Sequence, residues 1–106
     1  MWAAKGYDLK MTEGDWGIQL PFTIHDVTFS NGDEIKITVK TKLNGETKIA
    51  KTYSDISENK VMFALTEAES ELLPVGTYVY SIDWYHEGAF LCNIIPSASL
   101  KVVDKA

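Results

Sequence analysis

Residues 16–24, Trp-Gly-Ile-Gln-Leu-Pro-Phe-Thr-Ile, alternate strictly between apolar and other side chains. Successive side chains of a β-strand point to opposite faces, so this period of two predicts a strand with one side on a hydrophobic core. The residues on the apolar side are Trp16, Ile18, Leu20, Phe22 and Ile24. Pro21 has no backbone N–H, which predicts that the strand lies at an edge or a bulge.

The same alternation recurs along the rest of the chain. Its apolar positions are Ile35, Ile37 and Val39, then Val61, Phe63 and Leu65, then Tyr78, Tyr80, Ile82 and Trp84. In the last predicted hairpin, the alternation puts Phe90, Cys92 and Ile94 on the same face as Tyr78, Tyr80, Ile82 and Trp84. Antiparallel sheets with one face on a core have this pattern.

Turn and cap residues divide these strands. Asn44-Gly45 lies between Glu34–Thr41 and Thr47–Tyr53 and favours a type I′ turn, which predicts a hairpin. Thr66 and Glu69 have the spacing of a capping box, and Pro74 prevents continuation, so one short helical turn is expected near residues 66–73. Pro96–Ser99 is interpreted as a loop before a last strand, Leu100–Val103.

Seven or eight short strands with frequent turns predict an all-β, immunoglobulin-like antiparallel β-sandwich, with a partly closed barrel as the alternative. Tyr78 follows Gly76 at the position of the tyrosine corner of such domains, whose hydroxyl bonds back to the chain. At 106 residues, we expect a single domain spanning residues 1–106. The one cysteine, Cys92, cannot form an internal disulfide.

Composition excludes several classes of partner. The formal charge is −5 and the chain contains no arginine, so binding to nucleic acid is not expected. No segment has the length of a membrane span, and the first residues lack the apolar stretch of a signal peptide. We therefore expect synthesis in a cytoplasm without secretion, and no membrane partner.

The residues that could support chemistry form no recognisable motif. His25 and His86 have only Cys92 as a further soft ligand, and their spacing is not that of a zinc site. Cys92 alternates with Phe90 and Ile94, which predicts a small core side chain rather than a nucleophile. The carboxylates near turns do not have the spacing of a calcium-binding loop. They are Glu13, Asp15, Asp26, Asp33, Glu34 and Asp55. No catalytic residue, metal or cofactor is predicted.

The aromatic residues of the late hairpin give a positive signal. If Tyr78, Tyr80, Ile82 and Trp84 face the core, Tyr85, Leu91 and Ile95 face outward. Outward apolar side chains together predict a protein-interaction surface made by Tyr85, Leu91 and Ile95. The alternative is that a loop or the segment around Trp2 covers them.

Several stretches resemble one family of phage proteins. The stretches are Leu9–Asp15, Asp33–Lys40, Phe63–Glu69 and Leu72–Tyr80, with a looser similarity at Glu87-Gly88 and Leu100–Val103. In this order they are similar to the immunoglobulin-like N-terminal domains of baseplate upper proteins in phages of Gram-positive bacteria. The resemblance implies a non-catalytic connector domain that docks onto a tail, with no catalytic residues to transfer.

The expected function is therefore that of a stand-alone phage or prophage structural module in the virion. Its expected partners are other phage structural proteins, with a symmetric homo-oligomer as a further expectation. The alternative is a ligand-binding sandwich, for carbohydrate or adhesion, with Trp2, Trp16 or Trp84 as stacking platforms.

Overall fold

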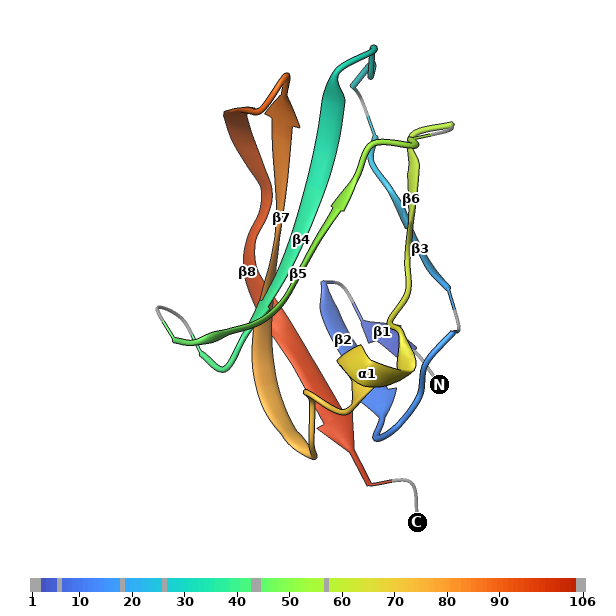
Figure 1. Ribbon diagram of the computed structural model, residues 1–106, viewed down its shortest axis with the longest axis vertical. Coiled ribbons are helices and arrows are strands. Elements are labelled where there is room, and N and C mark those ends of the chain that lie inside the picture. The colour runs from blue at the N-terminus through green and yellow to red at the C-terminus, as the bar shows by residue number, and fades with distance from the viewer. Residues whose placement is uncertain are drawn as a thin grey trace.

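The computed structural model describes residues 3–5, 7–17, 19–25, 27–42, 45–56 and 58–104. The chain is built almost wholly from strands, as the alternation predicts (Figure 1). In chain order the elements are β1 (Ala3–Lys5), β2 (Asp8–Thr12), β3 (Leu20–Thr23), β4 (Asp33–Lys40), β5 (Thr47–Tyr53), β6 (Lys60–Phe63), α1 (Glu67–Ser70), β7 (Gly76–His86) and β8 (Ala89–Val103).

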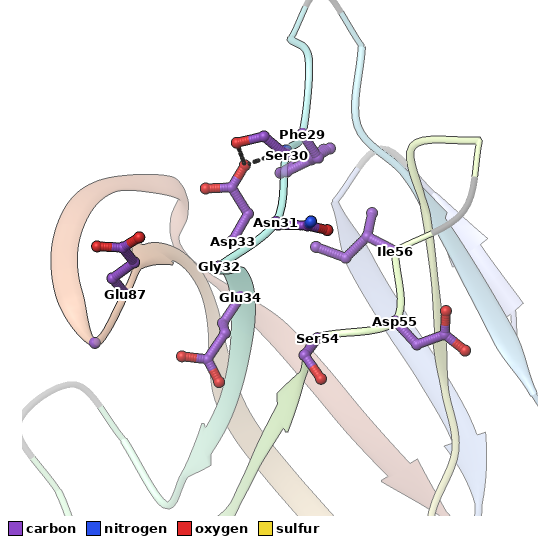
Figure 2. A pocket seen from close by; sticks show the side chains of 11 residues that line it. Phe29, Ser30, Asn31, Gly32, Asp33, Glu34, Ser54, Asp55, Ile56 and Glu87 are labelled. Carbon is purple, nitrogen blue, oxygen red and sulfur yellow. Dashed lines mark hydrogen bonds between the residues drawn. The ribbon is translucent and has the colours of Figure 1, made fainter.

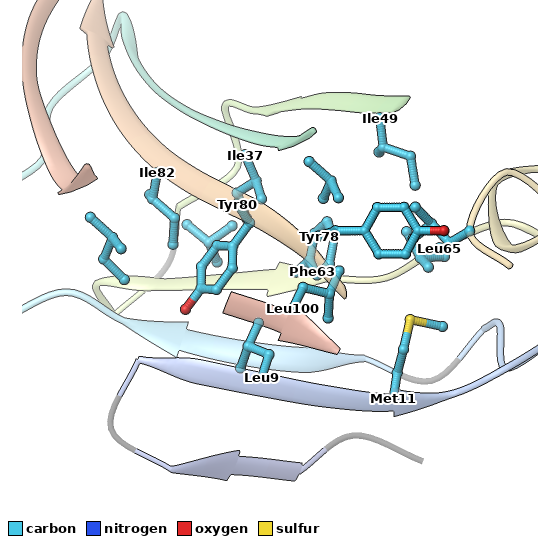
Figure 3. Close-up of a cluster of buried hydrophobic side chains, with 14 of the residues drawn as sticks. Leu9, Met11, Ile37, Ile49, Phe63, Leu65, Tyr78, Tyr80, Ile82 and Leu100 are labelled. Carbon is cyan, nitrogen blue, oxygen red and sulfur yellow. The ribbon is translucent and has the colours of Figure 1, made fainter. Parts of the chain in front are cut away.

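Two sheets form the sandwich. The larger has the order β1-β2-β8-β7-β4-β5, and the smaller pairs β3 with β6. Figure 3 shows the buried side chains that fill the core: Tyr80, Ile37, Leu9 and Met11 come from the larger sheet, and Phe63 comes from β6 of the smaller sheet. The predicted all-β sandwich with a short helix is confirmed, because the two apolar faces bury one another.

The central strands have the predicted register. β4 pairs antiparallel with both β5 and β7, and its alternate side chains Ile35, Ile37 and Val39 are buried. The predicted pairing of Glu34–Thr41 with Thr47–Tyr53 is therefore confirmed. Asn44 of its connecting turn lies outside the described residues.

β2 closes the sandwich by lying parallel to the end of β8. Leu9 is opposite Leu100 and Met11 is opposite Val102, and all four side chains are buried. The first and last parts of the domain are thereby joined through one apolar strip.

The predicted long strand over residues 16–24 is shorter in the structure. Only Leu20–Thr23 forms β3, and Trp16 is exposed. Gly17 has a φ of +77°, a left-handed conformation that ends the extended segment and turns Trp16 away from the core. Pro21 lies in β3, which pairs only with β6, so it occupies an edge strand as predicted.

α1 begins at the predicted capping box. The Thr66 hydroxyl accepts a hydrogen bond from the backbone N–H of Glu69, and the Glu69 carboxylate accepts one from the backbone N–H of Thr66 at 2.8 Å. The same Glu69 oxygen is 2.9 Å from the ammonium of Lys51, which also donates to the carbonyl of Ala64. This network fixes α1 against β5.

The tyrosine corner is also present. The hydroxyl of Tyr78 donates to the carbonyl oxygen of Pro74 at 2.7 Å, as the position after Gly76 predicts. Tyr78 is buried, and burial raises the pKa of its hydroxyl. The corner connects the turn after α1 to the start of β7.

β8 is longer than predicted. The structure continues the strand through Pro96–Ser99, where the sequence predicted a loop before Leu100–Val103. The pairing with β7 shifts between Ile82–Ile95 and Tyr80–Ala98, so Pro96 falls in an irregularity where its missing N–H breaks no regular ladder. None of the helices in the described ranges is long and apolar enough to cross a membrane.

Candidate functional site

The free end of the β7–β8 hairpin carries an exposed apolar patch. Glu87 and Gly88 both have positive φ, so a two-residue turn joins His86 to Ala89. The next pair, Tyr85 and Phe90, lies face to edge with ring centroids 5.7 Å apart. Phe90 is 54% exposed and Leu91 is 51% exposed. We call Tyr85, Phe90 and Leu91 the tip patch.

The structure places two of the three predicted surface residues, Tyr85 and Leu91, in the tip patch. Tyr85 is partly exposed, with the Lys36 ammonium 6.0 Å from its ring centroid, and Leu91 is exposed. The prediction for Ile95 is wrong, because its side chain is 7% exposed and belongs to the core, opposite Ile82. The two-residue turn at Glu87-Gly88 sets odd-numbered residues of β8 opposite even-numbered residues of β7, and the two register shifts between Tyr85 and Ile82 cancel in their effect on this parity, so Ile95 lies on the core face.

The core prediction for Phe90 and Cys92 is also wrong, because both side chains are exposed. Phe90 is a surface residue that the sequence reasoning missed. A signal for it was available: with Glu87-Gly88 as a two-residue turn, Phe90 must pair with Tyr85 and share its face.

A partly buried hydrogen bond between Asp33 and His86 braces the turn end of this hairpin. The Asp33 carboxylate accepts from the backbone N–H of Ser30 at 2.7 Å and lies 2.7 Å from Nδ1 of His86. The Ser30 N–H lowers the pKa of the Asp33 carboxyl, burial opposes this, and His86 lowers the pKa further. The backbone N–H of Glu87 also donates to the carbonyl of Gly32. These contacts hold the tip against the loop before β4.

An open hollow of about 570 Å³ lies beside the brace (Figure 2). Asp33, Glu34, Asp55 and Glu87 border it, with the apolar side chains of Phe29 and Ile56. Three of these carboxylates are among those that the sequence places near turns: Asp33 and Glu34 come from the start of β4, and Asp55 follows β5. Among the described residues, no three His, Cys, Asp or Glu side chains are grouped so that they could hold a metal ion.

The remaining candidates are dispersed. Glu13 and Asp15 lie after β2, and Asp26 lies outside the described residues. His25 is exposed beside β3, far along the chain from the His86 brace. The structure does not bring these residues into one site.

The tryptophans provide only part of the predicted surface on which a ligand could stack. Trp84 packs on Phe29 with ring centroids 4.9 Å apart, and Trp2 lies outside the described residues. Trp16 is exposed. One described indole is therefore available to a planar ligand.

A second hollow opens between the sheets beside β3. It measures about 290 Å³, is lined mainly by apolar side chains and reaches from Tyr7 and Phe22 to Ile82, Ile94 and Ile95. The hydroxyl of Tyr80 donates to the carbonyl of Tyr7 nearby, and burial, with Asp8 and Tyr7 adding to it, raises the pKa of Tyr80 to about 12.

Comparison of the chain with known protein families, with characterised proteins and with solved structures finds no match. The tip patch and the two hollows are therefore interpreted from their own chemistry.

Proposed function

We propose that this domain is a non-catalytic structural module of a phage or prophage particle that docks to other virion proteins through the tip patch. The observation that supports this most is the exposed cluster of Tyr85, Phe90 and Leu91 on a braced hairpin. Aromatic side chains held rigidly at a surface lose little conformational entropy on binding, which suits them to be the central contacts of an interface.

The brace beside the patch supports the same function. The Asp33–His86 contact and the Glu87–Gly32 hydrogen bond hold the turn end of the hairpin before any partner arrives. A preformed surface binds with a smaller ordering cost than a loop that must fold on contact. The resemblance to baseplate upper proteins rests on framework segments, including the capping box and the tyrosine corner, and supplies the class of partner.

The test begins with purified particles released by the bacterium that encodes the chain. Mass spectrometry should detect the domain in them at stoichiometric amounts. Structural proteins encoded next to it should then be purified and their affinity for the domain measured. Leu91→Asp should weaken that binding at least about tenfold, while Val75→Asp, at an equally exposed apolar position away from the tip, should not.

Two results would contradict the proposal. One is particles that contain no trace of the chain, together with no binding by any neighbouring structural protein. The other is a saturable change in tryptophan fluorescence with a glycan panel that Trp16→Ala abolishes, because this would favour the carbohydrate-binding alternative.

A further inference from the structure

The sandwich is incompletely filled on the side where β3 faces the larger sheet. The hollow of about 290 Å³ described above has the exposed residues Tyr7, Thr23 and His25 at its rim. It reaches inward to Ile82 and Ile95, which are both buried. Protein interiors contain few voids larger than a water molecule, so a hollow of this size that reaches the core is a candidate ligand site.

A smaller hollow of about 210 Å³ adjoins the first. Both are bordered by the same four residues, Tyr7, Phe22, Thr23 and Ile95. The smaller one also reaches Leu9 and Tyr80, two of the core side chains in Figure 3. The combined space is therefore elongated and follows the chain from Leu20 to His25.

The lining of this space is uncharged. None of the described residues that border the two hollows is an aspartate, a glutamate or a lysine. The hollow beside Asp33 differs, because four carboxylates border it. The Tyr80 hydroxyl, the polar group deepest in the lining, already donates to the carbonyl of Tyr7. An apolar lining with few polar groups is typical of pockets that bind small apolar ligands.

We propose that this space binds the alkyl chain of a free, single-chain amphiphile with an uncharged head, such as a primary alcohol. An apolar cavity of about 150 Å³ holds one benzene ring, so the larger hollow has room for a chain of about ten carbon atoms. Its elongated form favours an unbranched chain over a compact ring system. A bound chain would supply the dispersion contacts that the lining side chains lack.

Charge indicates the head and the source of the chain. The protein has a formal charge of −5, so an anionic head such as a carboxylate would be repelled. The same charge opposes approach to an anionic membrane surface, which favours a free amphiphile over a bilayer lipid. The hydroxyl of Thr23 and the imidazole of His25 at the rim are suitable hydrogen-bond partners for an uncharged hydroxyl head.

An NMR titration with n-octanol provides the first test. The methyl signals of Ile82, Ile94 and Ile95 should shift saturably, because all three border the larger hollow. The signals of Ile37 and Ile49, which are buried in the core but do not border either hollow, should stay unchanged. Absence of any saturable shift up to the solubility limit of octanol would overturn the proposal.

The length of the alcohol gives a second, quantitative test. Starting from n-hexanol, each added methylene should tighten binding about fourfold while it is buried. The affinity should level off at about ten carbon atoms, where the hollow is full. An affinity that keeps rising with chain length would indicate general adhesion to apolar surface and would contradict a site of defined size.

Variants at Ile94 test the location. Ile94→Trp should fill the hollow and abolish octanol binding, whereas Leu91→Trp, on the same strand but exposed and outside the hollow, should bind as wild type. Ile94→Ala should enlarge the hollow and raise the length limit by about two carbon atoms. The unshifted signals of Ile37 and Ile49 report that each variant is folded. A folded Ile94→Trp chain that still binds octanol, or an unchanged length limit in Ile94→Ala, would refute the site.

Phosphatidylcholine vesicles test the source of the chain. The protein should not sediment with them, and sedimentation that Ile94→Trp abolishes would overturn the free amphiphile in favour of a bilayer lipid. No residue of the tip patch borders either hollow, so this inference is independent of the proposed phage function. Leu91→Asp should weaken docking of virion proteins and leave octanol binding unchanged, which lets the two proposals fail separately.

Discussion

The hydroxyl of Tyr78 donates a hydrogen bond to the carbonyl oxygen of Pro74 across 2.7 Å, joining β7 to the turn that follows α1. Tyr78 is buried, but Pro74 is exposed, so water can replace the lost donor at the Pro74 carbonyl. The loss therefore costs the net contribution of one hydrogen bond, about 0.5–1.5 kcal/mol.

Tyr78→Phe should therefore lower the free energy of unfolding by about 0.5–1.5 kcal/mol, measured by urea denaturation. Tyr7→Phe is the matched control, since Tyr7 is 70% exposed, and it should change stability by less than about 0.5 kcal/mol. Equal stability of the two variants would show that the corner contributes nothing.

The carboxylates of Asp33 and Glu69 predict a loss of stability in acid. The ordinary pKa values are 3.8 and 4.5, and both are lowered in the folded chain. For Glu69, burial acts to raise the pKa, but the Thr66 N–H and Lys51 together outweigh it. Because the folded pKa values lie below the unfolded ones, this stabilisation is complete above the unfolded values and is lost as pH falls through the folded values.

The free energy of unfolding should therefore be level above about pH 5 and fall as the pH drops below about 4. Asp33→Asn and Glu69→Gln should each reduce that slope. Ile49→Val, which weakens the core without removing a carboxyl, should keep the wild-type slope at a lower overall stability. If both carboxyl variants kept the wild-type slope of unfolding free energy against pH, other groups would be responsible for the acid sensitivity.

Ile95 and Leu91 should respond in opposite ways to truncation. Ile95 is in the core, so Ile95→Ala should destabilise by about 2–4 kcal/mol. Leu91 is exposed, so Leu91→Ala should change stability by less than about 0.5 kcal/mol. Thermal or urea unfolding of the two variants therefore checks the register of β8. Similar losses of stability in both variants would contradict the pairing of β8 with β7 described above.

Gly32 should be more sensitive than Gly14 to an added methyl group. Both have positive φ, +92° and +84°, so alanine at either is strained by about 1–2 kcal/mol. A Cβ at Gly32 would also lie 2.9 Å from Cγ of Glu87, whereas one at Gly14 meets nothing within 4 Å. Gly32→Ala should thus be the less stable variant, and Gly32→Ala/Glu87→Ala should recover the difference. No recovery would indicate that backbone strain alone matters.

The parts of the fold that the sequence predicted are governed by local chemistry. The capping box of Thr66 and Glu69 and the corner of Tyr78 each depend on residues within four positions. The β4 alternation was equally readable, because β4 lies between two paired strands and its pairing is regular from Ile35 to Val39. The prediction failed at Trp16, where Gly17 ends the extended segment, and along β8, where it assigned the wrong residues to the core face.

The candidate site was less predictable because it depends on the pairing across one hairpin. The two-residue turn places Phe90 opposite Tyr85, and the two register shifts that follow cancel in their effect on parity, so that Ile95 lies opposite Ile82 on the core face. No residue of the hairpin marks where these register shifts occur. The brace of Asp33 and His86 joins positions 53 apart in sequence and had no local signal.

The parallel pairing of β2 with the end of β8 determines how the domain carries mechanical load. Tension applied between the start of β2 and the end of β8 pulls these strands in opposite directions along their length, so the bonds from Leu9–Leu100 to Thr12–Val103 are sheared together. The β1–β2 pairing is antiparallel and would instead open one bond at a time from Ala3. Under such tension the β1–β2 hairpin should open first and lengthen the chain by a few residues. The parallel β2–β8 pairing should then resist further extension.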